Sequence, residues 1–183
     1  MVRIVFFDMD GTLVEEESSW RIVHRFLGTD HLARRALEKF SRGEINYEEF
    51  VKHDVSLWPR GLHRSFFEQV FSSVRIKPEA YFVFNQLAGK RVLRVIVSSG
   101  LDVLAEKVCR TLSADECVSN RMIFDSKDCF TGEVEINVDP SRKLDVLKRV
   151  CEKYSIPLSE AAAVGDSVHD KSMFKAVKIS ILC

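Results

Sequence analysis

Residues 3–14 read Arg-Ile-Val-Phe-Phe-Asp-Met-Asp-Gly-Thr-Leu-Val, an apolar run that leads directly into two carboxylates. The run at residues 3–7 is rich in β-formers, which predicts a short strand buried on both faces. Asp8 and Asp10 follow it, two residues apart. Carboxylates beside a buried strand are costly unless they bind a cation or do chemistry. An Asp-rich turn that caps a helix is the plainer alternative, and this stretch alone leaves the two readings level.

The composition indicates an ordinary globular chain. Its 183 residues are 46% hydrophobic and 30% charged, with a formal net charge of zero, which suits one core and a small appended subdomain. A neutral chain without a Lys/Arg cluster predicts neither a nucleic-acid nor a membrane partner, and no apolar stretch reaches the length of a membrane span. Asp8 and Asp10 stand where a signal peptide would need its apolar centre, so we do not expect secretion.

The cysteines indicate a reducing compartment. They are odd in number, widely scattered and without a CxxC pair. We therefore expect neither a disulfide framework nor a zinc site, and we expect the cysteines to be small buried hydrophobes in a cytoplasmic protein. The five are Cys109, Cys117, Cys129, Cys151 and Cys183.

The segment after the two carboxylates has no strand pattern. Between residues 18 and 74, apolar residues recur at helical spacing in four stretches, and Asn46 is a candidate N-cap for the third. Such a segment is too long to be a loop. We predict a small α-helical cap subdomain at residues 15–74, inserted into a core made of residues 1–14 and 75–183.

Helical and strand patterns alternate over the rest of the chain. The expected helices cover residues 80–88, 102–112, 142–154 and 171–177, and the expected strands cover residues 92–97, 117–124, 130–138, 161–164 and 178–182. This alternation predicts an α/β fold with a doubly wound parallel sheet. Ligands bind at the carboxyl ends of the strands in such sheets, so the loops at Asp8, Ser98 and Asp166 would meet in one crevice.

That crevice would gather three carboxylates, a hydroxyl and an ammonium, from Asp8, Asp10, Asp166, Ser98 and Lys143. Oxygen ligands suit Mg²⁺, and phosphoryl transfer needs mainly positioning and neutralisation of negative charge. A carboxylate can be the nucleophile, giving an aspartyl-phosphate, while Asp10 acts as general acid and then as general base. Taken singly, Ser98 would more often cap a helix, and Lys143 would more often be a solvated lysine. The order and spacing of all five residues together favour an enzyme that transfers phosphoryl groups.

With these residues in view, the chain resembles the phosphoserine phosphatase-like group of the haloacid dehalogenase superfamily. Residues 8–14, Asp-Met-Asp-Gly-Thr-Leu-Val, match the family's first motif, DxDGT followed by two apolar residues. The resemblance implies that Asp8 is the nucleophile and Asp10 the acid/base. It also implies that both ligate the metal, Asp10 through its backbone carbonyl. The helical insert corresponds to a cap that closes over the substrate and excludes water.

The second and third motifs imply a phosphate site. Residues 95–98, Val-Ile-Val-Ser, match the second motif, which implies phosphate binding by Ser98 together with Ser99 and Gly100. Ser99 replaces the first glycine of that motif. Lys143 stands where the lysine of the third motif is expected, at the start of a helix.

The fourth motif, GDxxxD, matches residues 165–170, Gly-Asp-Ser-Val-His-Asp. The resemblance implies that Asp166 is a metal ligand and that Asp170 is a partner that braces the site. His169 is expected to be a neighbour of the site, because the family uses oxygen ligands there.

Substrate choice is expected to depend on the cap. Glu17 aligns with the glutamate that contacts the substrate's amino group in phosphoserine phosphatases, while Asp54 occupies the position of their carboxylate-binding arginine. A carboxylate repels another carboxylate, and Lys52 or His53 could substitute only if the register shifts. We therefore expect a substrate other than phosphoserine, or a broader range, and the two cap carboxylates would suit an amine-bearing phosphate ester.

The leading prediction is a Mg²⁺-dependent phosphomonoesterase that acts on a small phosphorylated metabolite, as a monomer or a homodimer. Phosphoserine phosphatase proper is one alternative. A receiver-type signalling module also uses an acidic cluster, a hydroxyl and a lysine, but it lacks a helical insert and a second acid two residues past its phosphorylated aspartate. A catalytically silent binding protein is a third class, and the intact set of acidic, hydroxyl and lysine residues argues against it.

Overall fold

A central, mostly parallel sheet organises the fold in the computed structural model, which describes residues 1–16 and 18–183. The described residues form six strands in the order β4-β3-β2-β1-β5-β6. Their bounds are β1 Ile4–Phe7, β2 Leu93–Leu101, β3 Glu116–Phe124, β4 Phe130–Glu135, β5 Ala161–Gly165 and β6 Ile179–Leu182. Every neighbouring pair is parallel except β3 and β4. The strand that carries the two aspartates therefore lies at the centre of the sheet.

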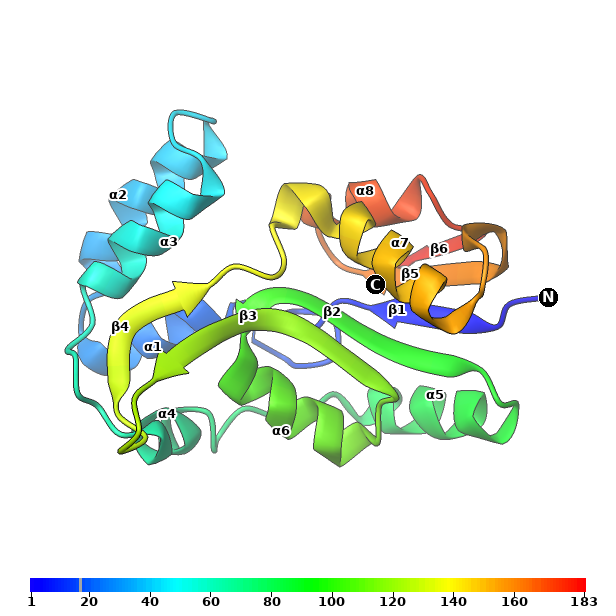
Figure 1. Ribbon diagram of the computed structural model, residues 1–183, viewed down its shortest axis with the longest axis horizontal. Coiled ribbons are helices and arrows are strands. Elements are labelled where there is room, and N and C mark those ends of the chain that lie inside the picture. Colours follow the sequence, from blue (N-terminus) through cyan, green and yellow to red (C-terminus); the bar gives the residue numbers. More distant parts are fainter. Residues whose placement is uncertain (17) are drawn as a thin grey trace.

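Helices cover both faces of this sheet, as Figure 1 shows. On one side lie α5 (Pro78–Gly89) and α6 (Asp102–Leu112), and on the other α7 (Lys143–Tyr154) and α8 (Lys171–Phe174). Successive residues of β1 alternate between the two faces: Phe7 belongs to one apolar cluster and Phe6 to the other. The predicted doubly wound α/β fold is confirmed.

Helices α1 (Ser19–Leu27), α2 (Asp30–Ser41), α3 (Tyr47–Ser56) and α4 (Arg64–Val70) lie between β1 and α5 in the described part of the chain. Asn46 forms a capping box with Glu49 at the start of α3, as predicted. Figure 1 shows α2 and α3 projecting beyond the end of the sheet, where α3 packs against β4, while α1 packs against β2 and α4, and α4 packs against α6. That residues 15–74 form a separate subdomain stays a prediction.

Three elements differ most from the expected bounds, and one of them, β4, ends at Glu135 instead of at residue 138. Strand β2 continues to Leu101, with a shift in its register against β3 between Val97 and Leu101. That irregularity, characteristic of a β-bulge, keeps Ser98 to Gly100 in extended backbone at the sheet edge. Helix α8 ends at Phe174, three residues before its expected end, and a 3₁₀ helix, Val168–Asp170, precedes it.

The prediction that the chain has no disulfide is wrong. Cys109 near the end of α6 and Cys117 in β3 form a disulfide, with their Cα atoms 6.3 Å apart. The eight-residue spacing gave no signal, because the pair depends on the chain turning back so that α6 packs beside β3. The other three cysteines are free within the described residues. No described helix is both long enough and apolar enough to cross a bilayer.

Candidate active site

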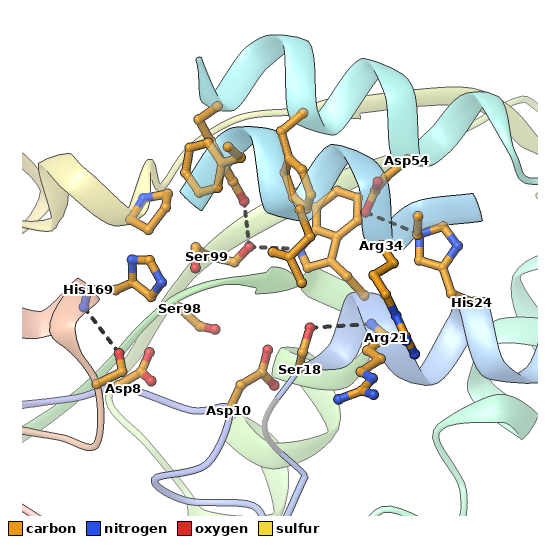
Figure 2. Close-up of a pocket in the computed structure, with 18 of the residues that line it drawn as sticks. Asp8, Asp10, Ser18, Arg21, His24, Arg34, Asp54, Ser98, Ser99 and His169 are labelled. Carbon is orange, nitrogen blue, oxygen red and sulfur yellow. Dashed lines mark hydrogen bonds and ion pairs between the residues drawn. The ribbon is translucent and has the colours of Figure 1, made fainter. Parts of the chain in front are cut away.

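The carboxyl ends of β1, β2 and β5 meet at one cavity of about 400 Å³. Asp8 and Asp10 follow β1, Ser98 lies in the last part of β2, and Asp166 follows β5. All four line the cavity, together with Lys143 at the start of α7. Figure 2 shows Asp8, Asp10 and Ser98 facing a wall of helices. The structure thus brings together the five side chains on which the predicted chemistry depends.

A buried lysine joins two of the acidic residues. Lys143 Nζ donates to Asp8 Oδ1 at 2.6 Å and to Asp170 Oδ1 at 2.7 Å. Asp170 Oδ2 accepts hydrogen bonds from the backbone N–H and hydroxyl of Ser167. Asp170 is therefore held from both sides and in turn fixes the ammonium beside Asp8. The alternative of a solvated Lys143 is wrong, since the residue is only 1% exposed.

Burial and charge set the pKa values of this pair. Burial raises the pKa of Asp8 to about 7, although Lys143 opposes the rise. Burial alone would lower the pKa of Lys143, but the carboxylates of Asp8 and Asp170 outweigh it and raise the pKa. The raised pKa keeps Lys143 an ammonium, and an ammonium 2.6 Å from Asp8 Oδ1 favours the ionised form of that carboxylate.

Asp10 is held through one oxygen only. Its Oδ2 accepts hydrogen bonds from the backbone N–H of Ser19 at 2.9 Å and from the Ser19 hydroxyl at 2.8 Å. Its Oδ1 is buried and has no hydrogen-bond partner among the described residues. Burial raises the pKa of Asp10 to about 6, against the lowering effect of Ser19. A carboxyl group with such a pKa can both donate and accept a proton near neutral pH.

Three carboxylates could hold a cation beside these groups. One oxygen each from Asp8, Asp166 and Asp170 lies within 4.8 Å of the others. Gly11, at φ +77°, makes this possible, because a Cβ there would lie 2.3 Å from Asp166 Oδ2. Thr12 donates to Asp166 Oδ1 at 3.4 Å, and burial raises the pKa of Asp166. An all-oxygen donor set fits a hard divalent metal ion. The backbone contribution of Asp10 stays a prediction.

The end of β2 supplies the other polar groups. Ser98 is buried, and its Oγ accepts a hydrogen bond from Gly100 N–H at 3.0 Å. It does not cap the next helix: the N-cap of α6 is Leu101. The structure thus places Ser98, Ser99 and Gly100 beside Asp10, while their roles in phosphate binding stay predictions.

The carbonyl of Ser99 faces three donors. They are the Trp20 indole N–H at 3.0 Å, the Tyr47 hydroxyl at 2.9 Å and the Asn120 amide at 2.8 Å. Trp20 and Tyr47 come from α1 and α3, so this carbonyl ties the helices to the sheet. Sequence reasoning missed this contact, because it joins positions far apart in the chain and a backbone oxygen leaves no sequence pattern.

The helical wall of the cavity contains a second buried acid. Asp54 and His24 are both buried, with His24 Nε2 3.1 Å from Asp54 Oδ2, although Nε2 makes no well-aligned hydrogen bond to the described residues. The Trp58 indole N–H donates to His24 Nδ1 at 3.2 Å. Because the indole can only donate, Nδ1 is the unprotonated nitrogen and Nε2 carries the proton that faces Asp54.

Two arginines that sequence reasoning missed also line the cavity. Arg21 and Arg34 contact opposite oxygens of Asp30, at 3.3 and 3.6 Å. Lys52, one of the suggested substitutes for a carboxylate-binding arginine, instead pairs with Glu48 on the surface. Glu17 lies outside the described residues. His169 lines the cavity as the expected neighbour.

Comparisons with known proteins agree with this geometry. The haloacid dehalogenase-like hydrolase family matches residues 5–175. Phosphoserine phosphatase of Halobacterium salinarum is 31% identical over 98% of this chain and 85% of its own length, and that of Methanocaldococcus jannaschii is 28% identical over 98% and 84%. A solved phospho-aspartyl intermediate analogue of phosphoserine phosphatase superimposes with a TM-score of 0.83 at 26% identity, covering 99% of this chain and 86% of that one. The chain therefore belongs to the haloacid dehalogenase-like hydrolase family, in which it is phosphoserine phosphatase-like.

Proposed function

We propose that this chain is a Mg²⁺-dependent phosphomonoesterase that hydrolyses a small phosphorylated metabolite through a phosphorylated Asp8. The observation that carries the proposal is the buried contact between Lys143 and Asp8, made beside Asp10 and Asp166 at one edge of the sheet. The likeness to an analogue of a phospho-aspartyl intermediate supports the same role for Asp8.

In the first step, a carboxylate oxygen of Asp8 attacks phosphorus and the bond to the leaving oxygen breaks. Lys143 contacts Oδ1, so Oδ2 is the oxygen that we assign to the attack. Asp10 gives its proton to the leaving alkoxide. The products of this step are a free alcohol and the aspartyl-phosphate.

In the second step, Asp10 takes a proton from water as the water oxygen attacks phosphorus. The bond between phosphorus and Asp8 breaks, which releases inorganic phosphate and restores both carboxyl groups. Ser98 and Lys143 would position the phosphate oxygens in both steps, and the helices above the cavity would exclude other water.

The proposed metal ligands are Asp8, Asp166 and the carbonyl of Asp10, with Asp170 bracing Lys143 next to them. When bound there, Mg²⁺ would supply positive charge that offsets the repulsion between Asp8 and a phosphate dianion. We choose Mg²⁺ because the donor set is all oxygen and partly exposed, which leaves room for the waters that this ion keeps.

Hydrolysis of p-nitrophenyl phosphate tests the proposal, with and without Mg²⁺, in the wild type and in Asp10→Asn. We expect turnover that depends on Mg²⁺ and falls by roughly a hundredfold or more in the variant. A receiver-type module or a catalytically silent binding protein would show no turnover, either with the wild type or with the variant.

For the substrate, we propose a phosphate ester other than phosphoserine, or a range broader than it. Asp54 lines the cavity, and its buried neighbour His24 accepts the Trp58 indole N–H at Nδ1, so we expect this position to repel a substrate carboxylate and to suit an amine. Phosphoserine and phosphoethanolamine differ by that carboxylate alone. We expect a kcat/KM for phosphoethanolamine equal to or above that for phosphoserine. Turnover of phosphoserine far above that of the other esters would overturn this proposal.

A monomer or homodimer in the cytoplasm completes the proposal. The cytoplasmic location is supported by the composition, while the Cys109–Cys117 disulfide counts against it, because disulfides are rare in reducing compartments. Thiol titration of protein isolated from cells without reductant tests whether the disulfide forms, and cell fractionation tests the location. Size-exclusion chromatography tests the oligomeric state.

A further inference from the structure

Ser19 lies between the side chain of Asp10 and the end of β2. It is fully buried and is the first residue of α1. Its backbone N–H and its hydroxyl both donate to Asp10 Oδ2, and its Oγ accepts the backbone N–H of Leu101 at 3.1 Å. A backbone N–H can only donate, so the Ser19 hydroxyl must accept there and its own proton is free to face Asp10.

These contacts make the two oxygens of Asp10 unequal. Oδ2 accepts two hydrogen bonds and has no further room for a proton of its own, whereas Oδ1 is buried and lacks a partner among the described residues. When Asp10 is protonated, the proton therefore belongs on Oδ1. Asp10 lines the cavity, so we take the proton on Oδ1 as the one that passes to a leaving group once substrate is bound.

Gly100 makes this arrangement sterically possible. A Cβ at that position would lie 2.4 Å from Ser19 Oγ, 2.6 Å from Asp10 Oδ2 and 3.0 Å from Ser98 Oγ. The helix is anchored again one residue later, where the Trp20 indole donates to Ser99 O. The seating of α1 against the end of β2 thus determines where Asp10 points.

We propose that Ser19 is a positioning residue that holds Asp10 by Oδ2 and keeps Oδ1 as the oxygen that carries the proton to the leaving group. The inference rests on the proposed phosphomonoesterase activity and deepens it. It also makes the alignment of the acid depend on α1, so that the acid is assembled only when the first helix of the insert is docked on the sheet.

Leaving-group dependence tests this proposal. Phenyl phosphate needs a proton on its departing oxygen, whereas 2,4-dinitrophenolate leaves without one. We compare kcat/KM, which reports the first step alone. In Ser19→Ala we expect a loss of roughly tenfold or more with phenyl phosphate and of no more than about threefold with 2,4-dinitrophenyl phosphate, the same pattern as in Asp10→Asn but smaller.

Two further variants keep the test decisive. Ser72→Ala removes an exposed hydroxyl that donates to the Gln69 carbonyl, and it should change kcat/KM for neither substrate. Ser19→Cys keeps the shape with a weaker donor and should show the same selective loss in milder form. Retained 2,4-dinitrophenyl phosphate turnover demonstrates that a variant is folded.

An equal loss with both substrates, or no loss with either, would overturn the positioning role while leaving the proposed activity standing. If the wild type hydrolysed none of these esters in Mg²⁺, the proposed function itself would fail, and the role of Ser19 with it.

Discussion

The sheet edge and the helical wall of the cavity each bury an aspartate, but they treat it differently. Asp8 at the sheet edge is paired with an ammonium that a second carboxylate fixes from behind. Asp54 in the helical wall faces a histidine whose other nitrogen is occupied by an indole N–H. The first arrangement holds the carboxylate that we propose as the nucleophile, whereas the second places a buried carboxyl group in the wall opposite the sheet edge.

On the proposed function, this contrast assigns the chemistry to the sheet and the selectivity to the helices. The sheet edge is built from strand ends whose register is fixed by the parallel pairing of β1 with β2 and β5. The helical wall is joined to it through a few polar contacts, among them those to Ser99 O. Substitutions at the edge should therefore affect every substrate, and substitutions in the wall should affect some substrates more than others.

The largest expected effect comes from Asp8→Asn, which removes the nucleophile but keeps the shape. We expect kcat/KM for p-nitrophenyl phosphate to fall by about 10⁴-fold or more, which is the order of loss expected when an enzyme loses its nucleophile. Asp54→Asn, the matched change in the wall, should stay within about threefold. Similar losses at both positions would remove the distinction between the two regions.

Removal of the buried ammonium should destabilise the fold as well as the site. Lys143→Met leaves Asp8 and Asp170 facing each other without a cation, and breaking a buried ion pair costs about 3–5 kcal/mol. Urea unfolding measures the loss. Lys153→Met breaks an exposed pair with Glu116 and should have little effect. A Lys143 variant as stable as that control would show that the buried pair is not needed.

The buried acid should also make the stability of the metal-free protein depend on pH. Burial raises the pKa of Asp10 from its ordinary value of 3.8 to about 6, so the folded state binds this proton more tightly than the unfolded state does. Its stabilising effect is full below pH 3.8 and is lost as the pH rises through about 6, at a cost of about 3 kcal/mol. Asp8 continues the trend toward pH 7.

Asp10→Asn should remove its part of that slope, which urea unfolding in EDTA at several pH values would measure. Asp145→Asn on the surface of α7 is the control and should leave the slope unchanged. A wild-type stability that rises between pH 4 and pH 6 would contradict the assigned burial of Asp10.

The smallest expected effect concerns selectivity at the wall. Asp54→Asn removes the negative charge, so the ratio of kcat/KM for phosphoethanolamine to that for phosphoserine should fall by about three- to tenfold, the scale of an interaction of about 1 kcal/mol between partly screened charges. Glu48→Gln on the exposed side of α3 is the control. An unchanged ratio in Asp54→Asn would remove Asp54 from substrate choice.

The sequence was sufficient to predict the parts that depend on local pattern. The alternation of strands and helices, the carboxylates after β1 and the Asn46 cap are each encoded within a few residues. The contacts of Ser19, the donors around Ser99 O, the His24–Asp54 pair and the Cys109–Cys117 bond are not, because each joins elements that meet only after the chain has folded. The contacts of a backbone carbonyl and the tautomer of a histidine leave no residue pattern in the sequence.

The attack by Asp8 on phosphorus is the central claim, and Asp10→Asn with 2,4-dinitrophenyl phosphate tests it most directly. With this substrate the first step needs no general acid, whereas the second step in the variant lacks its general base. Rapid mixing should give a burst of about one dinitrophenolate per chain, and an acid quench followed by peptide mass spectrometry should find the phosphate on Asp8. Steady turnover without a burst and without phosphate on Asp8, or phosphate on another residue, would contradict the account.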